Sequence, residues 1–167
     1  ADLKKNYPSA NVGEYIEHDA EIARDASRHL QDGDPHATMV YFGSVDETGH
    51  KVGFHPSVKP YVAAIEVVDG HVGQLLQAID ARPSRAGENW LVLVSTDHGG
   101  RGTGHGSGHK VPEIRTVFLI VSGRSVAHGP IEPPPMTVDV PPTMFAHLGV
   151  AVDPEWGWEG HPLVLCA

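Results

Sequence analysis

Acidic and histidine residues recur in three short polar motifs of this chain. The first motif is Asp46-Glu-Thr-Gly-His50, the second is Asp97-His98, and the third is Gly104-His105-Gly106. Zinc in proteins takes imidazole nitrogens and carboxylate oxygens as ligands, usually four for each ion. The motifs therefore predict a metal site with the following candidate ligands: Asp46, His50, Asp97, His98 and His105.

The backbone of both Asp-His motifs must curve if the side chains are to share an ion. Asp46 and His50 stand four residues apart, so they converge if the segment between them curls. Asp97 and His98 are adjacent, and adjacent side chains of a strand point to opposite faces. The glycines after His98 permit an irregular backbone there. Asp-x-x-x-His alone is a weak signal and Asp-His-Gly alone a moderate one, but the two followed by Gly-His-Gly are more specific.

Helices and apolar strands are expected to position these motifs. Apolar residues at helical spacing predict helices over residues 13–30 and 57–79, the second capped by Ser57. A short helix is expected over residues 140–148, where two prolines suit its first turn. Continuous apolar runs predict buried strands, and Gly-rich polar stretches predict loops. The strands are expected at 37–43, 90–95 and 115–121, and the loops at 46–55 and 99–109.

This alternation of helices and continuous apolar strands predicts an α/β fold. The expected sheet is mostly parallel, with helices on both faces. Functional groups in such folds gather beyond the carboxyl ends of strands. The first two motifs each follow an expected strand directly, so we expect them to lie at one edge of the sheet.

Composition limits the function classes. The 167 residues suffice for one domain with a core, with 40% apolar and 20% charged residues. No apolar run approaches the roughly 20 residues of a membrane helix. The net charge of −9 disfavours a nucleic-acid-binding surface, which needs clustered Lys and Arg. The single cysteine, Cys166, excludes an internal disulfide.

Histidine is unusually frequent, with twelve residues. Most are expected at the surface, including His18, His29, His36, His71 and His147. His55 and His161 are weaker candidates for the site, and surface positions are preferred for both. Trp156 and Trp158 could stack on a nucleobase, although packing of the tail onto the core is preferred.

In their order along the chain, the three motifs resemble those of the alkaline phosphatase superfamily, and most closely its type I phosphodiesterase and nucleotide pyrophosphatase branch. Residues 138–149 look like the helix near the C-terminus of that family. The stretch Glu159-Gly-His-Pro-Leu163 is similar to its closing turn. The resemblance extends over residues 13–165.

The resemblance implies two divalent metal ions, of the zinc type. One ion would be held by Asp46, His50 and a later histidine. For that third ligand the Gly-His-Gly context favours His105, and His109 is the alternative. The other ion would take the Asp97-His98 pair. The implied reaction is hydrolysis of phosphate mono- or diesters, with the ions activating a nucleophile and stabilising charge on the leaving oxygen.

Basic residues beside the ligands are candidates for substrate contact. Lys51 and Arg101 flank the motifs and could contact phosphate oxygens, as could His109. The alternative, that Lys51 and Arg101 are simply solvated, is equally open.

The chain departs from the family in one respect. The family's N-terminal half, with a further Asp and the Thr or Ser nucleophile, has no counterpart here. Ser44 does not match the nucleophile position, so no catalytic residue is nominated. We therefore expect residues 1–167 to form a single domain that is the C-terminal metal-binding portion of an incomplete alkaline phosphatase-like fold. The expected partners are a small phosphate ester and the missing half.

Two alternatives remain open at this stage. The chain could be a catalytically incompetent fragment that holds metal, or a member of the related phosphoglycerate mutase or sulfatase groups. Alone, it is expected to bind at most one ion well and to turn over substrate poorly. The sequence does not fix the compartment, although the exported character of many relatives suggests secretion or the periplasm.

Overall fold

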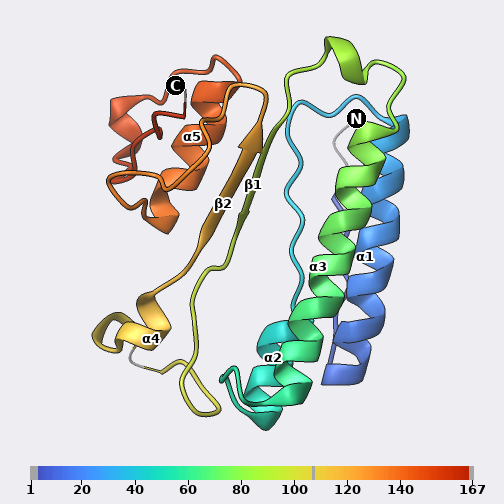
Figure 1. Ribbon diagram of the computed structural model, residues 1–167, viewed down its shortest axis with the longest axis vertical. Helices are drawn as coiled ribbons and strands as arrows, with labels where there is room; N and C mark the ends of the chain where they lie inside the picture. Colours follow the sequence, from blue (N-terminus) through green and yellow to red (C-terminus); the bar gives the residue numbers. More distant parts are fainter. Residues whose placement is uncertain (1–3, 107, 166–167) are drawn as a thin grey trace. The chain divides into compact units, whose positions relative to one another are not determined.

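The computed structural model describes residues 4–106 and 108–165 of the chain (Figure 1). The chain divides into two compact units. The first contains the residues up to Gly87 together with Gly100–Gly106, and the second contains Glu88–Gly99 and the residues after Gly106. The expectation of one domain over residues 1–167 stays a prediction. Cys166 lies outside the described residues.

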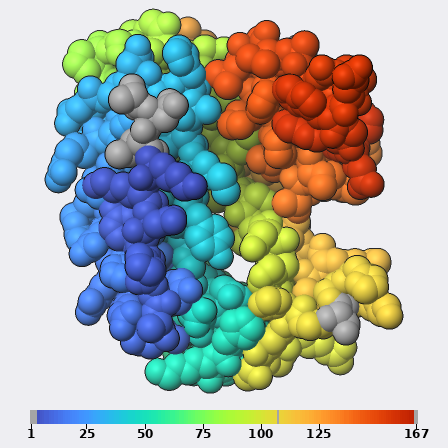
Figure 2. Space-filling model, turned by 180° about the vertical axis from the view of Figure 1, so that it is seen from behind, coloured from blue at the N-terminus to red at the C-terminus, as the bar shows by residue number. Residues whose placement is uncertain are grey.

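The described part of the first unit contains a layer of three α-helices. They are α1 (Val12–Asp32), α2 (Ser44–Val52) and α3 (Lys59–Asp80). The α1 and α3 helices lie side by side, and α2 contacts both (Figure 1). Their apolar contact includes the buried residues Ala23, Leu30, Ala78 and Ile79. The outer face of α1, in blue, forms part of the surface seen in Figure 2.

The predicted helices over 13–30 and 57–79 are confirmed, with one correction at a cap. The α1 helix begins where the Asn11 side chain accepts a hydrogen bond from the Glu14 N–H. Ser57 does not cap α3, because the helix starts two residues later, with Val58 as its N-cap. The Ser57 hydroxyl instead pairs with Nδ1 of His55 at 2.7 Å.

The prediction of a strand over residues 37–43 is wrong. These residues form no strand, and none of the described strands pairs with them. An extended apolar segment becomes a strand only when its backbone groups join a ladder. Met39 and Tyr41 accordingly remain exposed, at 91% and 58%.

The prediction of a loop over residues 46–55 is also wrong, because α2 occupies residues 44–52. Glycine at position 49 and the polar composition suggested a loop. However, buried Asp19 of α1 accepts hydrogen bonds from the N–H groups of Gly43 and Ser44, at 3.0 and 2.9 Å. This distant carboxylate satisfies donors at the start of α2 that no local side chain caps.

The second unit contains a two-stranded sheet and two α-helices. Strands β1 (Leu91–Ser95) and β2 (Leu119–Gly123) pair antiparallel, with Leu91 opposite Gly123 and Ser95 opposite Leu119. The helices are α4 (Pro112–Arg115) and α5 (Val140–His147). The predicted strands at 90–95 and 115–121 are thus found, the second starting later because α4 takes residues 112–115.

The expected mostly parallel sheet is not confirmed, because the two described strands run in opposite directions. Parallel neighbours need a crossover, usually a long helix that returns the chain to the start of the first strand. The only α-helix between β1 and β2 in the described residues, α4, has four residues. Both α-helices and a sheet are present, so the α/β class holds at that coarser level.

The expected helix near the C-terminus is present as α5, with Pro141 and Pro142 in its first turn. Just before it, the buried Asp139 carboxylate accepts hydrogen bonds from two backbone N–H groups, those of Met136 at 2.7 Å and His161 at 2.9 Å. This carboxylate therefore fixes the turn that contains His161. Trp156 and Trp158 pack edge-on against Phe145 of α5, in agreement with a packing role.

One histidine expected at the surface is buried. His71 of α3 is only 9% exposed, and its ring lies 5.6 Å from that of Phe42. It occupies the same helix as the core residues Ala78 and Ile79, on a face that packs within the first unit. Among the described helices, none has the length and apolar character needed to cross a membrane.

Candidate metal centre

Three predicted ligands converge in the first unit. His50 Nε2 lies 3.4 Å from Asp46 Oδ2 and 3.0 Å from His105 Nε2. His105 Nε2 lies 3.7 Å from Asp46 Oδ1. Two ligand atoms on one tetrahedral zinc ion, at about 2.0–2.2 Å from it, are roughly 3.3–3.6 Å apart. The three measured separations lie close to that range, with a different oxygen of Asp46 facing each histidine.

The helical backbone of α2 brings Asp46 and His50 together. Residues four apart on a helix share a face, so Asp46 and His50 project from the same side of α2. The sequence predicted their convergence through a curled loop, and the helix achieves it more rigidly. His105 comes from the Gly-rich segment Gly100–Gly106, which belongs to the same unit.

A backbone carbonyl fixes the orientation and tautomer of His50. Its Nδ1 lies 2.9 Å from the carbonyl oxygen of Thr103. A carbonyl only accepts, so Nδ1 carries the hydrogen and Nε2 carries the lone pair. A metal-binding histidine characteristically donates its other ring N–H in this way. In the metal-free protein, His105 Nε2 must then be the donor to His50 Nε2, and ligation would need His105 to carry its hydrogen on Nδ1.

The environment of Asp46 also suits a cation. Its Oδ1 is buried and has no hydrogen-bond partner. A buried carboxylate oxygen without a donor is costly unless a positive charge lies nearby. The side chains of Asp46, His50 and His105 remain 31%, 37% and 35% exposed, so solvent reaches the group. The residues present thus fit a divalent ion with an open position for water or substrate.

The Asp46 carboxylate affects the pKa of Tyr61 in α3. The pKa of the Tyr61 hydroxyl is raised, first by burial and second by the Asp46 carboxylate. Both effects oppose formation of a phenolate. Tyr61 therefore stays protonated beside the candidate ligands at neutral pH.

The Asp97-His98 pair lies in the second unit, just after β1. The Asp97 side chain is 66% exposed, and its Oδ1 accepts a hydrogen bond from the His98 backbone N–H. His98 Nδ1 donates to the carbonyl of Gly99 at 2.9 Å, so its lone pair also lies on Nε2. That Nε2 is 3.7 Å from Asp97 Oδ2. The irregular backbone expected after β1 is present, because the strand ends at Ser95.

The remaining predicted site residues are exposed. Lys51 follows His50 at the end of α2, and Arg101 lies in the Gly-rich segment. His109 belongs to a short helical turn, Gly108–Lys110, in the second unit. The contacts of His105 with His50 and Asp46 favour it over His109 as the third ligand. The roles of all the candidate residues remain predictions.

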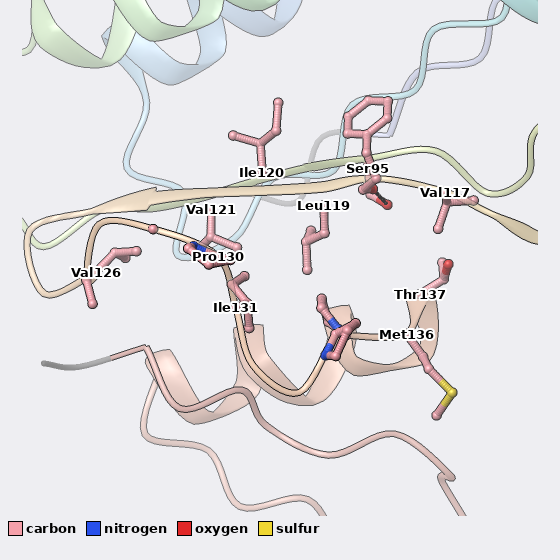
Figure 3. A pocket seen from close by; sticks show the side chains of 15 residues that line it. Ser95, Val117, Leu119, Ile120, Val121, Val126, Pro130, Ile131, Met136 and Thr137 are labelled. Carbon is pink, nitrogen blue, oxygen red and sulfur yellow. Dashed lines mark hydrogen bonds between the residues drawn. The ribbon is translucent and has the colours of Figure 1, made fainter.

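A separate hollow lies in the second unit. It has a volume of about 370 Å³ and lies between β2 and the proline-rich segment that follows it. Leu119 and Val121 point from β2 toward Ile131, whereas Ile120 points to the opposite face of the strand (Figure 3). None of the predicted metal ligands lines this hollow.

Asp19 and Tyr61 support the site and were missed by sequence reasoning. Asp19 stands three residues after Ile16 and four before Ala23, within the apolar stripe of α1. A carboxylate at such a position is a signal of a buried polar contact, although its partner could not be predicted. Tyr61 occupies an ordinary amphipathic position of α3 and gave no such signal.

Comparison with known proteins establishes the fold of the chain and its family. It is similar in structure to a protein from Bacteroides thetaiotaomicron VPI-5482 that is named provisionally as a sulfatase, with a TM-score of 0.60 and 17% sequence identity. The match covers 98% of this chain and 48% of that one, so the chain spans about half the length of its structural relative. This likeness establishes the fold.

The family model for type I phosphodiesterases and nucleotide pyrophosphatases matches residues 4–119. The chain belongs to this family, which confirms the resemblance seen in its motifs. No curated protein matches the chain significantly.

Proposed function

We propose that the chain supplies the metal ligands of a two-metal phosphoesterase, which hydrolyses phosphate mono- or diesters. Asp46, His50 and His105 would hold one divalent ion, most suitably zinc. The observation that carries this proposal is the convergence of these three side chains within the first unit, at separations of 3.0–3.7 Å. Membership of the phosphodiesterase family supports the reaction class.

The Asp97-His98 pair would supply two ligands to the second ion. Support comes from the His98 Nδ1 hydrogen bond to the Gly99 carbonyl, which places the lone pair on Nε2. Two protein ligands are fewer than a zinc site normally has. Further ligands and the nucleophile would come from outside residues 1–167. The antiparallel β1–β2 pair would then be part of a larger, mostly parallel sheet of the alkaline phosphatase type.

When bound, the ions would act as Lewis acids on the phosphoryl group and lower the pKa of the attacking group. The residues of the chain would orient the ligands, balance the charge of the ion and attract the substrate. The carbonyl of Thr103 orients the His50 ring, and the carboxylate of Asp46 offsets the charge of the ion. Lys51 and Arg101 are exposed cations that would attract the anionic ester to the site.

The test combines metal content with hydrolysis of chromogenic esters. The chain is freed of metal with a chelator and titrated with Zn²⁺. It is then assayed on bis(p-nitrophenyl) phosphate, p-nitrophenyl phosphate and p-nitrophenyl sulfate. We expect one tightly bound ion and slow hydrolysis of a phosphate ester that requires Zn²⁺. Asp46→Asn should lose both, while Asp69→Asn, on the exposed part of α3, should keep both.

Four results would count against the proposal. Absence of Zn²⁺ binding would remove the metal site, and hydrolysis unaffected by the chelator would remove the metal from the reaction. Preference for the sulfate ester would move the activity to the sulfatase class, to which the structural relative is provisionally assigned. Two tight ions with rapid turnover would contradict the view that further ligands lie outside the chain.

A further inference from the structure

We propose that Phe54 is a positioning residue of the metal centre, which holds the rings of His50 and His105 in the orientation that one ion needs. This inference rests on the proposed function, because it presupposes that the two histidines bind a metal. Phe54 follows α2 by two residues and is half-buried. Nothing in the sequence motifs assigns it a role.

The Phe54 ring contacts both histidines edge-on. Its centroid lies 5.3 Å from that of His50 and 6.4 Å from that of His105, with interplanar angles of 85° and 80°. Such T-shaped contacts have a preferred geometry and therefore restrain the rings they involve. The two imidazoles are 4.8 Å apart, so the phenyl ring supports them as a pair. On its other side, the ring packs edge-on against Tyr61 at 5.6 Å.

Two glycines make room for this ring. A Cβ at Gly49 of α2, or at Gly100 of the Gly-rich segment, would overlap the Phe54 ring. Gly49 is buried and stands in a helix interior, where glycine is usually unfavourable by comparison with alanine. Its presence is explained if the close approach of the phenyl ring is required. The ring is thus seated between the segment that carries His50 and the segment that carries His105.

The backbone of Phe54 joins the same two segments. Its N–H donates to the carbonyl of Gly102 at 2.7 Å. Gly102 has φ +59° and Gly53 has φ +111°, conformations that favour glycine. Together with the hydrogen bond from His50 to the Thr103 carbonyl, this contact fixes the Gly-rich segment against the end of α2. Phe54 therefore acts on the site through both its ring and its backbone.

The experiment measures Co²⁺ binding by the full chain, because the visible spectrum of Co²⁺ reports both affinity and coordination geometry. The variants are Phe54→Ala, Phe54→Tyr and Gly49→Ala, together with the double variant of Phe54→Ala and Gly49→Ala. Phe145→Ala is the matched control, because Phe145 also packs edge-on against aromatic rings but lies in the second unit. Thermal unfolding of each metal-free variant shows whether it is folded.

We expect Phe54→Ala to weaken Co²⁺ binding by about tenfold or more, the usual cost of losing a group that orients a ligand. Phe54→Tyr, which keeps the ring, should bind close to the native affinity, and Phe145→Ala should be unchanged. Gly49→Ala should weaken binding in the native background but not further in the Phe54→Ala background, since the added methyl then meets no ring. This coupling is a readout that a general loss of stability would not produce.

The experiment distinguishes failure of the proposed function from failure of the positioning role of Phe54. Absence of Co²⁺ binding by the native chain would overturn the proposed function, and this inference with it. If the native chain binds Co²⁺ and Phe54→Ala binds it with the same affinity and spectrum, the positioning role of Phe54 is overturned while the proposed function stands. Additive effects of Phe54→Ala and Gly49→Ala on Co²⁺ affinity would overturn the positioning role in the same way. If Phe54→Ala does not fold, Gly49→Ala decides: unchanged Co²⁺ affinity in that folded variant would refute the positioning role.

Discussion

The hydrogen bonds of Asp19 to the start of α2 can be tested by removing them. Asp19 is 2% exposed, and its two carboxylate oxygens accept hydrogen bonds from the N–H groups of Gly43 and Ser44. No other side chain caps this end of the helix. Asp19→Ala would therefore leave two buried donors unpaired at the N-terminus of the helix that presents Asp46 and His50.

The structure sets the size of the effect. A hydrogen bond to a charged group contributes about 1.5–3 kcal/mol. Two such bonds give an expected loss of about 3–6 kcal/mol for Asp19→Ala in the free energy of unfolding. Asp19→Asn keeps the volume and one acceptor oxygen, so its loss should be about half as large. A domain of this size is typically stable by about 5–15 kcal/mol, so the alanine variant should remain folded but be much weakened.

The assay is urea unfolding followed by circular dichroism, in metal-free buffer, to separate stability from metal binding. Asp69→Asn, an exposed carboxylate on α3, is the control and should change stability by less than about 0.5 kcal/mol. A loss below about 1 kcal/mol for Asp19→Ala would refute the reasoning. It would mean that water satisfies the two N–H groups and that α2 does not depend on α1 for its cap.

Three further predictions follow from buried or crowded groups. Because the folded state raises the pKa of Tyr61, part of the free energy of unfolding is present below about pH 10 and is lost as the pH rises through the folded pKa. In Asp46→Asn, spectroscopic titration should show a Tyr61 pKa closer to its ordinary value. Arg82→Met should cost about 2–4 kcal/mol in urea unfolding, because its guanidinium donates to two backbone carbonyls at the end of α1. Gly160→Ala should lower the melting temperature, because a Cβ there would overlap the Val138 carbonyl, whereas Gly106→Ala has open space.

The sequence predicted the helices of the first unit because their burial pattern is local. Apolar residues at three- and four-residue steps are enough to define α1 and α3, and their ends were predicted to within about two residues. The α2 helix escaped prediction because its start depends on Asp19, which is more than twenty residues away in the chain. A local pattern does not contain that contact.

The sheet was predicted less well, since strand direction and pairing are not local properties. Strands were predicted at residues 90–95 and 115–121 and are found at 91–95 and 119–123, but nothing in these apolar runs specified antiparallel pairing. Residues 37–43 are also apolar but belong to none of the described strands. An apolar run therefore predicts a tendency to form a strand, whereas the neighbouring chain decides whether the ladder forms.

For the candidate site, residue types and spacing pointed to Asp46 and His50, and the resemblance to the family favoured His105; their role as metal ligands stays a prediction. Their chemistry is specific, and their spacing is compatible with one ion. The supporting residue Phe54 was not predictable, because a single aromatic residue in a Gly-rich stretch has no characteristic spacing. Its contacts depend on two glycines, one of them far along the chain.

The central claim is that Asp46, His50 and His105 form one metal site, and calorimetric titration with Zn²⁺ tests it most directly. The metal-free native chain should bind one ion tightly. His50→Ala and His105→Ala should each abolish that binding, and His109→Ala should retain it. Tight binding that survives His105→Ala, or that is lost in a folded His109→Ala variant, would contradict the account.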